Sequence, residues 1–513
     1  MTRRYAILPL MNRTIAALCA VILAASFASA EEWNTMGPRA MGMGGAGVAL
    51  AQGPLASYWN PGALGRPTEN AYGFALPFSV HGALTGQAIA GANDLKNAQN
   101  NCPALIAAGN TAACQAQVNT ALGELSDPTN GLRVDGSAGG NFKIGKIAFF
   151  LNGFVDAGVV PRIDNVHTTA ANIAAGANTS ALIIKGAEVT EFGAGYGHEL
   201  PWVPGLFVGG DLKLMRAKVG YASQRIISAT GQNDNGESNL VSDLKNGAAS
   251  SGNVGLDAGA LWDANKAFEN VWWAPRVGLT GRNLNNPSFT QAGTAAADGV
   301  GGKYHVNPQA RMGVSISPFH WWNIAADLDL TRNLTPVDGV ASRQFGLGTE
   351  VNIFNRSWIN IPLRFGLARN VEAATNMFTI GAGINLLHLM IDFAGEASPK
   401  RIDTQTQGSS TKIPQEFGAS VSISILFGGS EAKRAAKKAA DETKTKDETP
   451  VKAETPVKAE TPAKDEKPAA TEKTAAPAKA SNDVPPAQTE QIKQNAAQSQ
   501  KELDQTKPAP AGK

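Results

Sequence analysis

The stretch that most constrains the fold runs from Gln415 to Phe427, because its side chains alternate between apolar and polar. Every odd position from Phe417 onward is apolar, and the even positions up to Ser424 are small or polar. Successive side chains of a strand point to opposite faces, so the stretch predicts a strand with one apolar and one wet face. A soluble sheet or a membrane barrel could contain it. The alternation recurs upstream and the composition changes after Phe427, which favours a barrel that this strand closes.

Fourteen segments have the length that a tilted strand needs to cross the hydrocarbon layer. The predicted strands are Asn70–Gly82, Ser137–Ile144, Lys146–Asp156, Gly186–Glu199, Leu206–Ser223, Asn253–Asp263, Trp273–Leu284, Val306–Pro318, Asn323–Asn333, Arg343–Phe354, Trp358–Arg369, Asn376–Leu386, Leu389–Glu396 and Gln415–Phe427. The fold class that follows is all-β, a 14-stranded antiparallel transmembrane β-barrel over residues 70–427.

The connections between these strands alternate in length. If both mature termini lie in the periplasm, the even connections face the periplasm and should be short. They are residue 145 and residues 200–205, 319–322, 355–357 and 387–388, together with residues 264–272, which are of intermediate length. The odd connections at 83–136, 157–185, 224–252, 285–305 and 397–414 are long, and those at 334–342 and 370–375 are shorter. A soluble sandwich gives no reason for this sorting.

Seven tryptophans lie in or beside the short connections: Trp202, Trp262, Trp272, Trp273, Trp321, Trp322 and Trp358. Indole rings favour the membrane–water interface, so these residues predict a girdle at the periplasmic rim. The alternative is that they cap a soluble core.

Charged side chains fall on the face of the predicted strands that is opposite to the lipid-facing residues, such as Ile324, Leu328, Leu330 and Ile361. The predicted lumen-lining residues are Arg311, Asp327, Asp329, Glu350, Arg364, Asp392 and Glu396. Unpaired buried charges are costly, so we expect the two arginines to pair with the acids. Such pairs could form a structural ion network or line a substrate path. In Leu206–Ser223 the charges change face, which predicts a bulge near Met215 or exposure above the membrane.

The two ends of the chain differ from the barrel. Residues 1–30 have the basic start, short apolar run and Ala28-Ser29-Ala30 site of a secretory signal peptide. Residues 428–513 contain no aromatic residue and repeat an ETPVKA-like motif, which predicts a disordered periplasmic tail rich in Lys, Glu, Ala and Pro. This tail is either a solvated extension or a tether to the cell wall or to a periplasmic protein.

No arrangement typical of a catalytic or metal site emerges, and we expect no enzyme and no cofactor. The six histidines include no metal-binding pair, and the net charge of +2 argues against a nucleic-acid partner. Cys102 and Cys114 are close enough in an exported chain to form a disulfide, although two free thiols remain an alternative.

Residues 31–69 precede the first strand and are dense in glycine around the motif R-A-M-G-M-G-G-A, followed by A-S-Y-W-N-P-G-A-L. This pattern resembles the start of FadL-type outer-membrane transport barrels, and more closely their TraF-like conjugal transfer and PorV-like relatives. The resemblance implies a hatch inside the lumen, with Gly44, Gly45, Tyr58, Trp59, Asn60 and Pro61 as hatch residues.

The resemblance also implies a location in the outer membrane, in contact with its lipid, and the binding or transport of small hydrophobic compounds. The alternative function is a non-transporting interaction or scaffold protein of conjugal transfer, secretion or envelope tethering. The polar lumen and the tail favour that alternative.

Overall fold

A computed structural model describes residues 29–67, 71–226, 240–268, 271–354, 358–406 and 409–427. The predicted tail and all but the last two residues of the predicted signal peptide lie outside the described residues. No helix in the described part of the chain is long and apolar enough to cross a membrane.

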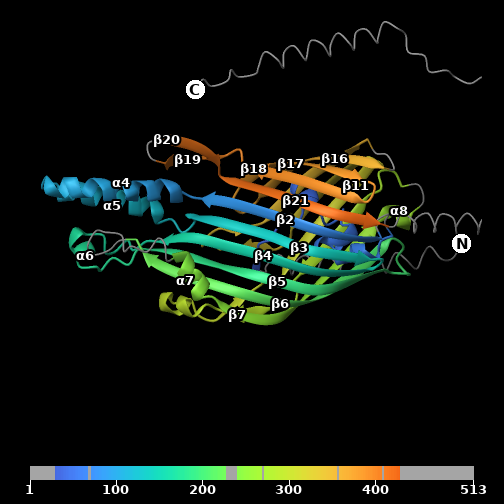
Figure 1. Cartoon of the computed structure of the whole chain (residues 1–513), viewed down its shortest axis with the longest axis horizontal. Coiled ribbons are helices and arrows are strands. Elements are labelled where there is room, and N and C mark those ends of the chain that lie inside the picture. The colour runs from blue at the N-terminus through green and yellow to red at the C-terminus, as the bar shows by residue number, and fades with distance from the viewer. Residues whose placement is uncertain are drawn as a thin grey trace, which may run out of the picture. The chain divides into compact units, whose positions relative to one another are not determined.

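Fourteen strands form one closed antiparallel barrel, which confirms the predicted fold class (Figure 1). In chain order the barrel strands are β2 (Tyr72–Thr85), β3 (Gly131–Ile144), β4 (Ile147–Arg162), β5 (Ala181–Glu199), β6 (Leu206–Arg225), β7 (Ala249–Asp263), β8 (Arg276–Arg282), β11 (Gln309–Phe319), β12 (Trp322–Asp329), β15 (Gln344–Ile353), β16 (Ile359–Asn370), β17 (Thr375–Leu386), β18 (Leu389–Ala397) and β21 (Glu416–Phe427). Each corresponds to one predicted strand, and β21 pairs with β2 to close the ring.

The strand ends at the even connections match the prediction within three residues, whereas several strands extend further at the odd end. β3 starts six residues earlier than predicted and β4 ends six residues later. The prediction relied on apolar alternation, but the hydrogen-bonded ladder continues past the apolar band into the odd connections.

Three local predictions are wrong. β8 starts at Arg276 and not at Trp273, because Trp273 and Ala274 have φ angles of 69° and 41° that no strand adopts. β12 ends at Asp329, so Leu330, expected to face lipid, turns inward and is 5% exposed. β6 has no bulge near Met215, because its pairing with β5 and β7 is continuous.

The odd connections have structure of their own (Figure 1). They contain helices α4 (Ala88–Ala107), α5 (Thr111–Leu125), α6 (Ala170–Ala174) and α7 (Leu240–Asn246), the turn η3 (Gly293–Asp298) and the short strands β9 (Ser288–Thr290), β10 (Lys303–His305), β13 (Arg332–Leu334), β14 (Ala341–Ser342), β19 (Arg401–Thr406) and β20 (Ser409–Pro414). Among the even connections, only the one after β7 contains a helix, α8 (Ala264–Ala267), within the described residues.

The outer face of the barrel is apolar over most of its height. Its exposed side chains include Leu212, Leu214, Phe365, Ile380 and Phe393, each at least 50% exposed. This places hydrophobic residues outside and polar residues inside, the reverse of a soluble protein and the arrangement of a membrane barrel.

Residues 32–66, called the N-terminal segment below, contact the inner wall of the barrel. β1 (Ser29–Glu31) precedes them, and they contain α2 (Pro38–Met41), η1 (Gly53–Leu55), α3 (Ala56–Trp59) and η2 (Pro61–Gly65). Most of these residues are buried, and they form an apolar cluster with Phe154, Phe207 and Leu261 of the wall.

The two described ends of the chain lie at opposite ends of the barrel. β1 pairs in parallel with β13, which belongs to an odd connection. β21 ends at Phe427, opposite Tyr72, beside the even connections. Residues 29–31 therefore lie at the odd end of the barrel, and the side of the membrane on which the mature termini lie stays a prediction.

Candidate functional site

The lumen is crossed by ion pairs that join the N-terminal segment to the wall. Glu350 on β15 faces Arg364 on β16 across the ladder, and Arg364 Nε donates to Glu350 Oε2 at 2.8 Å. Arg364 Nη1 also donates to Asp392 Oδ1 at 2.6 Å. From the N-terminal segment, Arg39 donates to both Glu350 carboxylate oxygens at 2.9 and 2.8 Å. One carboxylate therefore holds a wall arginine and a segment arginine together.

Arg311 and Asp329 form a second pair, on facing positions of β11 and β12, with Nε donating to Oδ1 at 2.5 Å. Both arginines therefore pair with predicted acids, as expected. Asp327, the fourth candidate acid, accepts hydrogen bonds at its Oδ2 from the backbone N–H groups of Gly47 and Val48 at 2.8 and 2.9 Å. This predicted wall residue therefore binds the backbone of the N-terminal segment.

A third network lies on β5–β8. Lys213 is fully buried, with Nζ 2.9 Å from Glu191 Oε1 and 2.9 Å from Asp257 Oδ2. Arg282 donates from Nη2 to Glu191 Oε2 at 3.1 Å. Its guanidinium carbon lies 4.2 Å from the centre of the Tyr58 ring, a cation–π contact with the N-terminal segment.

The two proposed hatch glycines, Gly44 and Gly45, both have a positive φ, and only Gly44 is packed tightly against the wall. Gly44 has φ +68°, and a Cβ added there would lie 2.5 Å from the carbonyl oxygen of Leu367, so only glycine fits. Gly45 has φ +86° and nothing within 4 Å of such a Cβ.

The aromatic side chains of the N-terminal segment are hydrogen-bonded to its own backbone. Trp59 Nε1 donates to the Met36 carbonyl at 3.1 Å, and the Tyr58 hydroxyl donates to the carbonyl of Asn34. Asn60 Nδ2 donates to Ala260 O of the wall at 3.0 Å, just before Pro61 starts η2.

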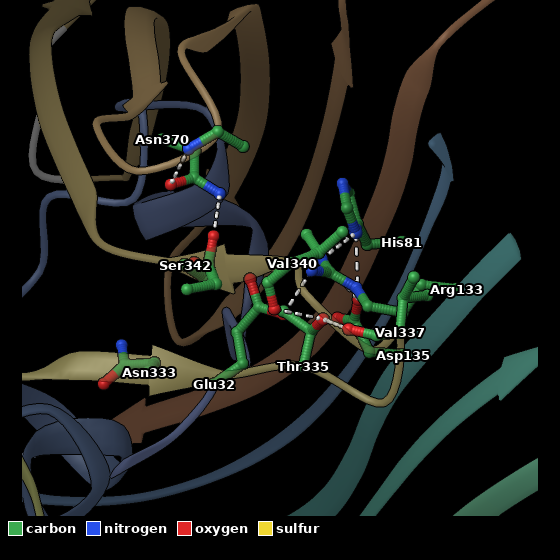
Figure 2. A network of polar contacts seen from close by, with 12 residues as sticks. Glu32, His81, Arg133, Asp135, Asn333, Thr335, Val337, Val340, Ser342 and Asn370 are labelled. Carbon is green, nitrogen blue, oxygen red and sulfur yellow. Dashed lines mark hydrogen bonds and ion pairs between the residues drawn. The ribbon is translucent and has the colours of Figure 1, made fainter. Parts of the chain in front are cut away.

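A polar cluster lies at the odd end of the lumen, where Figure 2 shows Glu32, His81, Arg133 and Asp135 converging. His81 Nδ1 lies 2.9 Å from Asp135 Oδ2, and Arg133 donates to the same oxygen at 3.1 Å. Arg133 also forms an ion pair with Glu32 of the N-terminal segment. Burial raises the pKa of Glu32 above its ordinary value, and the nearby Arg133 partly offsets that rise.

Two small cavities adjoin Glu32 and Asn34. Each has about 40 Å³ of free volume, room for on the order of three water molecules. An engineered cavity that holds benzene is several times larger, about 150 Å³. The first cavity is lined by His81, Arg133, Glu396 and other mainly polar residues, and the methionines of the N-terminal segment are packed away from solvent.

Between the Lys213 network and the odd connections, the inner wall of β5 and β6 becomes apolar. A buried cluster, called the vestibule cluster below, packs these two strands against the connection that follows β8. Its members are Ala187, Val189, Met215, Ala217, Val219, Phe289 and Val306. Val189 and Val306 also line the second cavity, so the cluster and the cavity are adjacent.

The remaining predicted residues have the following places. All seven tryptophans lie at the even-connection end; five are exposed, and Trp262 and Trp322 are half-buried. Cys102 of α4 and Cys114 of α5 form a disulfide. Among the described residues no group of three or more His, Cys, Asp or Glu side chains could hold a metal ion.

Sequence reasoning missed the cluster around Arg133 and the network around Lys213. Residues 131–136 were assigned to a connection. Apolar Leu132 and Val134 nevertheless alternate there with charged Arg133 and Asp135, as apolar and polar residues alternate in the predicted part of β3. That alternation could have found the pair. The partner Arg39 lies 311 residues from Glu350, a distance over which no local pattern operates.

A sequence model of the family described as "F plasmid transfer operon, TraF, protein" matches residues 57–329, more than half of the chain. No curated protein matches this chain. Among solved structures, the toluene transporter TbuX of Ralstonia pickettii is 14% identical with a TM-score of 0.39, covering 76% of this chain and 98% of its own. The toluene transporter TodX of P. putida is 12% identical, TM-score 0.39, with 78% and 100% covered. A Pseudomonas aeruginosa FadL homologue is 9% identical, TM-score 0.38, with 78% and 100% covered.

Proposed function

Because the chain belongs to the F plasmid transfer operon TraF family, we propose that it is an outer-membrane barrel of that family that admits small hydrophobic compounds. In this proposal the odd connections face outward. The observation that carries it is the vestibule cluster, which puts apolar side chains inside the barrel at the odd end, next to a cavity. Apolar side chains at this position are not needed to hold a polar plug, but they would favour the transfer of a hydrophobic compound from water into the barrel.

The exit in this proposal is sideways through the wall, because the ion pairs block the route along the axis. The ladder between β2 and β3 is interrupted: Ala75 pairs with Asn141 and Phe78 with Ala138, but Leu76 and Pro77 have no partner. Proline has no N–H to donate. Two glycines, Gly139 and Gly140, lie opposite on β3.

The test is uptake of labelled toluene or fatty acid into proteoliposomes, with the interrupted seam locked. Leu76→Cys with Gly140→Cys would join β2 to β3, and oxidation should stop uptake until the bridge is reduced. The matched control, Leu76→Cys with Ile423→Cys, joins β2 to β21 at an intact position and should leave uptake unchanged. Uptake that continues through the locked seam would refute the lateral exit, and no uptake by the unmodified chain would refute transport.

A second candidate function is a non-transporting protein of conjugal transfer or envelope attachment. It is favoured by the size of the cavities, which are too small for a hydrocarbon ring, and by the ion pairs that fasten the N-terminal segment. In this case the tail at 428–513 is expected to bind the cell wall or a periplasmic protein. Co-sedimentation with purified cell wall, lost on deletion of residues 428–513, would support it; equal sedimentation of both forms would reject the wall as partner.

A further inference from the structure

Charged residues are rare on the outer face of the barrel and are restricted in position. At the outward positions of the fourteen strands, the residues charged at neutral pH are Glu188, Arg216, Lys218 and Arg369. All four are exposed, and all lie in the odd-end half of their strands. Arg216 and Lys218 are successive outward residues of β6, about 6.6 Å apart along the strand.

The height of these cations matches one edge of a hydrocarbon layer. Arg216 is ten residues from Leu206, the first residue of β6, and Arg369 is ten residues from Ile359, the first of β16. Ten residues at about 3.3 Å each, tilted by about 40°, rise about 25 Å, which is the height of the apolar band of a membrane barrel. Below Arg216, the outward residues Leu214 and Leu212 are 60% and 58% exposed. Arg216 and Arg369 therefore lie about one hydrocarbon thickness from the even end of the barrel.

The ladder neighbours of the two β6 cations include two hydroxyl side chains and one carboxylate. Arg216 lies between Thr190 on β5 and Gly252 on β7, and Lys218 lies opposite Ser250. Arg216 Nε donates to Ser250 Oγ at 3.0 Å, which holds the guanidinium across β7. Within the described part of the chain, neither cation is in an ion pair, although Glu188 is the ladder partner of Lys218. Arg369 has only Phe345 and Asn376 as ladder neighbours.

We propose that the Arg216–Lys218 patch, with the hydroxyls of Ser250 and Thr190, binds a phosphate group of an outer-leaflet glycolipid. Its acyl chains would lie on the leucines below. With Glu188 opposite Lys218, the patch carries two cations, one carboxylate and two hydroxyls, so it keeps a net positive charge. This patch matches a phosphate, because charge-assisted hydrogen bonds to phosphate oxygens are strong and arginine can make two of them. The choice of leaflet rests on the orientation in the proposed function, with the odd connections outside.

The experiment measures binding of fluorescent lipid A by the full chain in phosphatidylcholine nanodiscs. Lipid A that retains its phosphates is compared with dephosphorylated lipid A and with inorganic phosphate as competitor. Arg216→Gln with Lys218→Gln should weaken binding of the phosphorylated form on the order of tenfold. Arg216→Gln alone should weaken it less, and the matched control Arg369→Gln should leave it unchanged. Folding of each variant is checked by the shift of the unheated barrel on a gel.

Three results would overturn the proposal: equal binding of phosphorylated and dephosphorylated lipid A, an equal loss in Arg369→Gln, or no loss in the double variant. Complete displacement by inorganic phosphate would assign the patch to a free anion and would also overturn it. The measurement requires no transport. Failed uptake by the unmodified chain would therefore refute the proposed function without deciding whether the patch binds lipid A. The Arg216→Gln/Lys218→Gln variant is expected to retain uptake.

Discussion

The buried Glu350 carboxylate offers a sharp test of what holds the lumen together, because two arginines reach it from different parts of the chain. Arg364 comes from the wall and is 2% exposed, and Arg39 comes from the N-terminal segment and is 26% exposed. Replacing each by methionine keeps much of the side-chain volume and removes only the charge and the donors. The two variants should differ because they leave different partners behind.

Arg364→Met removes both the 2.8 Å bond to Glu350 and the 2.6 Å bond to Asp392, whose side chain is 2% exposed. Asp392 then remains buried without this cation, a situation that costs about 3–5 kcal/mol. Arg39→Met leaves Glu350 with Arg364 and with Asn323, whose Nδ2 donates at 3.1 Å. The bonds that Arg39 makes are partly exposed and screened by solvent, so we expect Arg39→Met to lower the free energy of unfolding by about 1–2 kcal/mol.

The assay is reversible urea unfolding in lipid vesicles, followed by tryptophan fluorescence. Arg369→Met is the control, since it removes an exposed arginine from the same strand and should change the free energy of unfolding by about 0.5 kcal/mol or less. Adding Asp392→Asn to Arg364→Met should recover part of the loss by removing the uncompensated charge. Equal costs for Arg364→Met and Arg39→Met, or no recovery in the double variant, would refute the reasoning.

Three further outcomes are expected. Gly44→Ala should destabilise the barrel by about 2 kcal/mol or more in the same assay, because its Cβ would meet the Leu367 carbonyl at 2.5 Å and the residue has a positive φ. Cys102→Ser should make the α4–α5 hairpin sensitive to protease while β-sheet circular dichroism is unchanged, because the bridge lies outside the barrel. The hydrogen bond with the His167 ring, helped by neighbouring backbone N–H groups, holds the pKa of Asp164 below its ordinary value. Because the pKa of Asp164 is lower in the folded state, its ionised carboxylate stabilises the loop above about pH 4, and this stability is lost as the pH falls toward the folded pKa. Amide exchange around Asp164 should therefore rise only in acid. In Asp164→Asn, exchange should already be fast at neutral pH.

The sequence predicted the wall better than the contents of the lumen. Alternation assigned Arg364, Glu350 and Asp392 to the inner face, and ladder geometry places Arg364 directly opposite Glu350. Arg364 reaches Asp392 across the intervening strand β17. This reasoning failed where a partner comes from a distant segment without alternation. The backbone N–H groups that bind the Asp327 carboxylate come from about 280 residues earlier in the chain, and no alternation marks them.

The ends of the strands were also predicted less accurately than the strands themselves. The predicted strands ended five or six residues short at the odd end of β3, β4 and β5, although apolar Leu132 and Val134 still alternate with charged residues there. The start of β8 was misplaced because a positive φ at Trp273 and Ala274 is a backbone property that their side chains do not signal.

The unequal seams of the barrel have a mechanical consequence. The seam between β2 and β21, which joins the two ends of the ring, has twelve consecutive residue pairs, whereas the seam between β7 and β8 has six. Under a pulling force the ring should therefore tear first at β7–β8, in the middle of the sequence, and the last contact made during synthesis should be among the last to rupture.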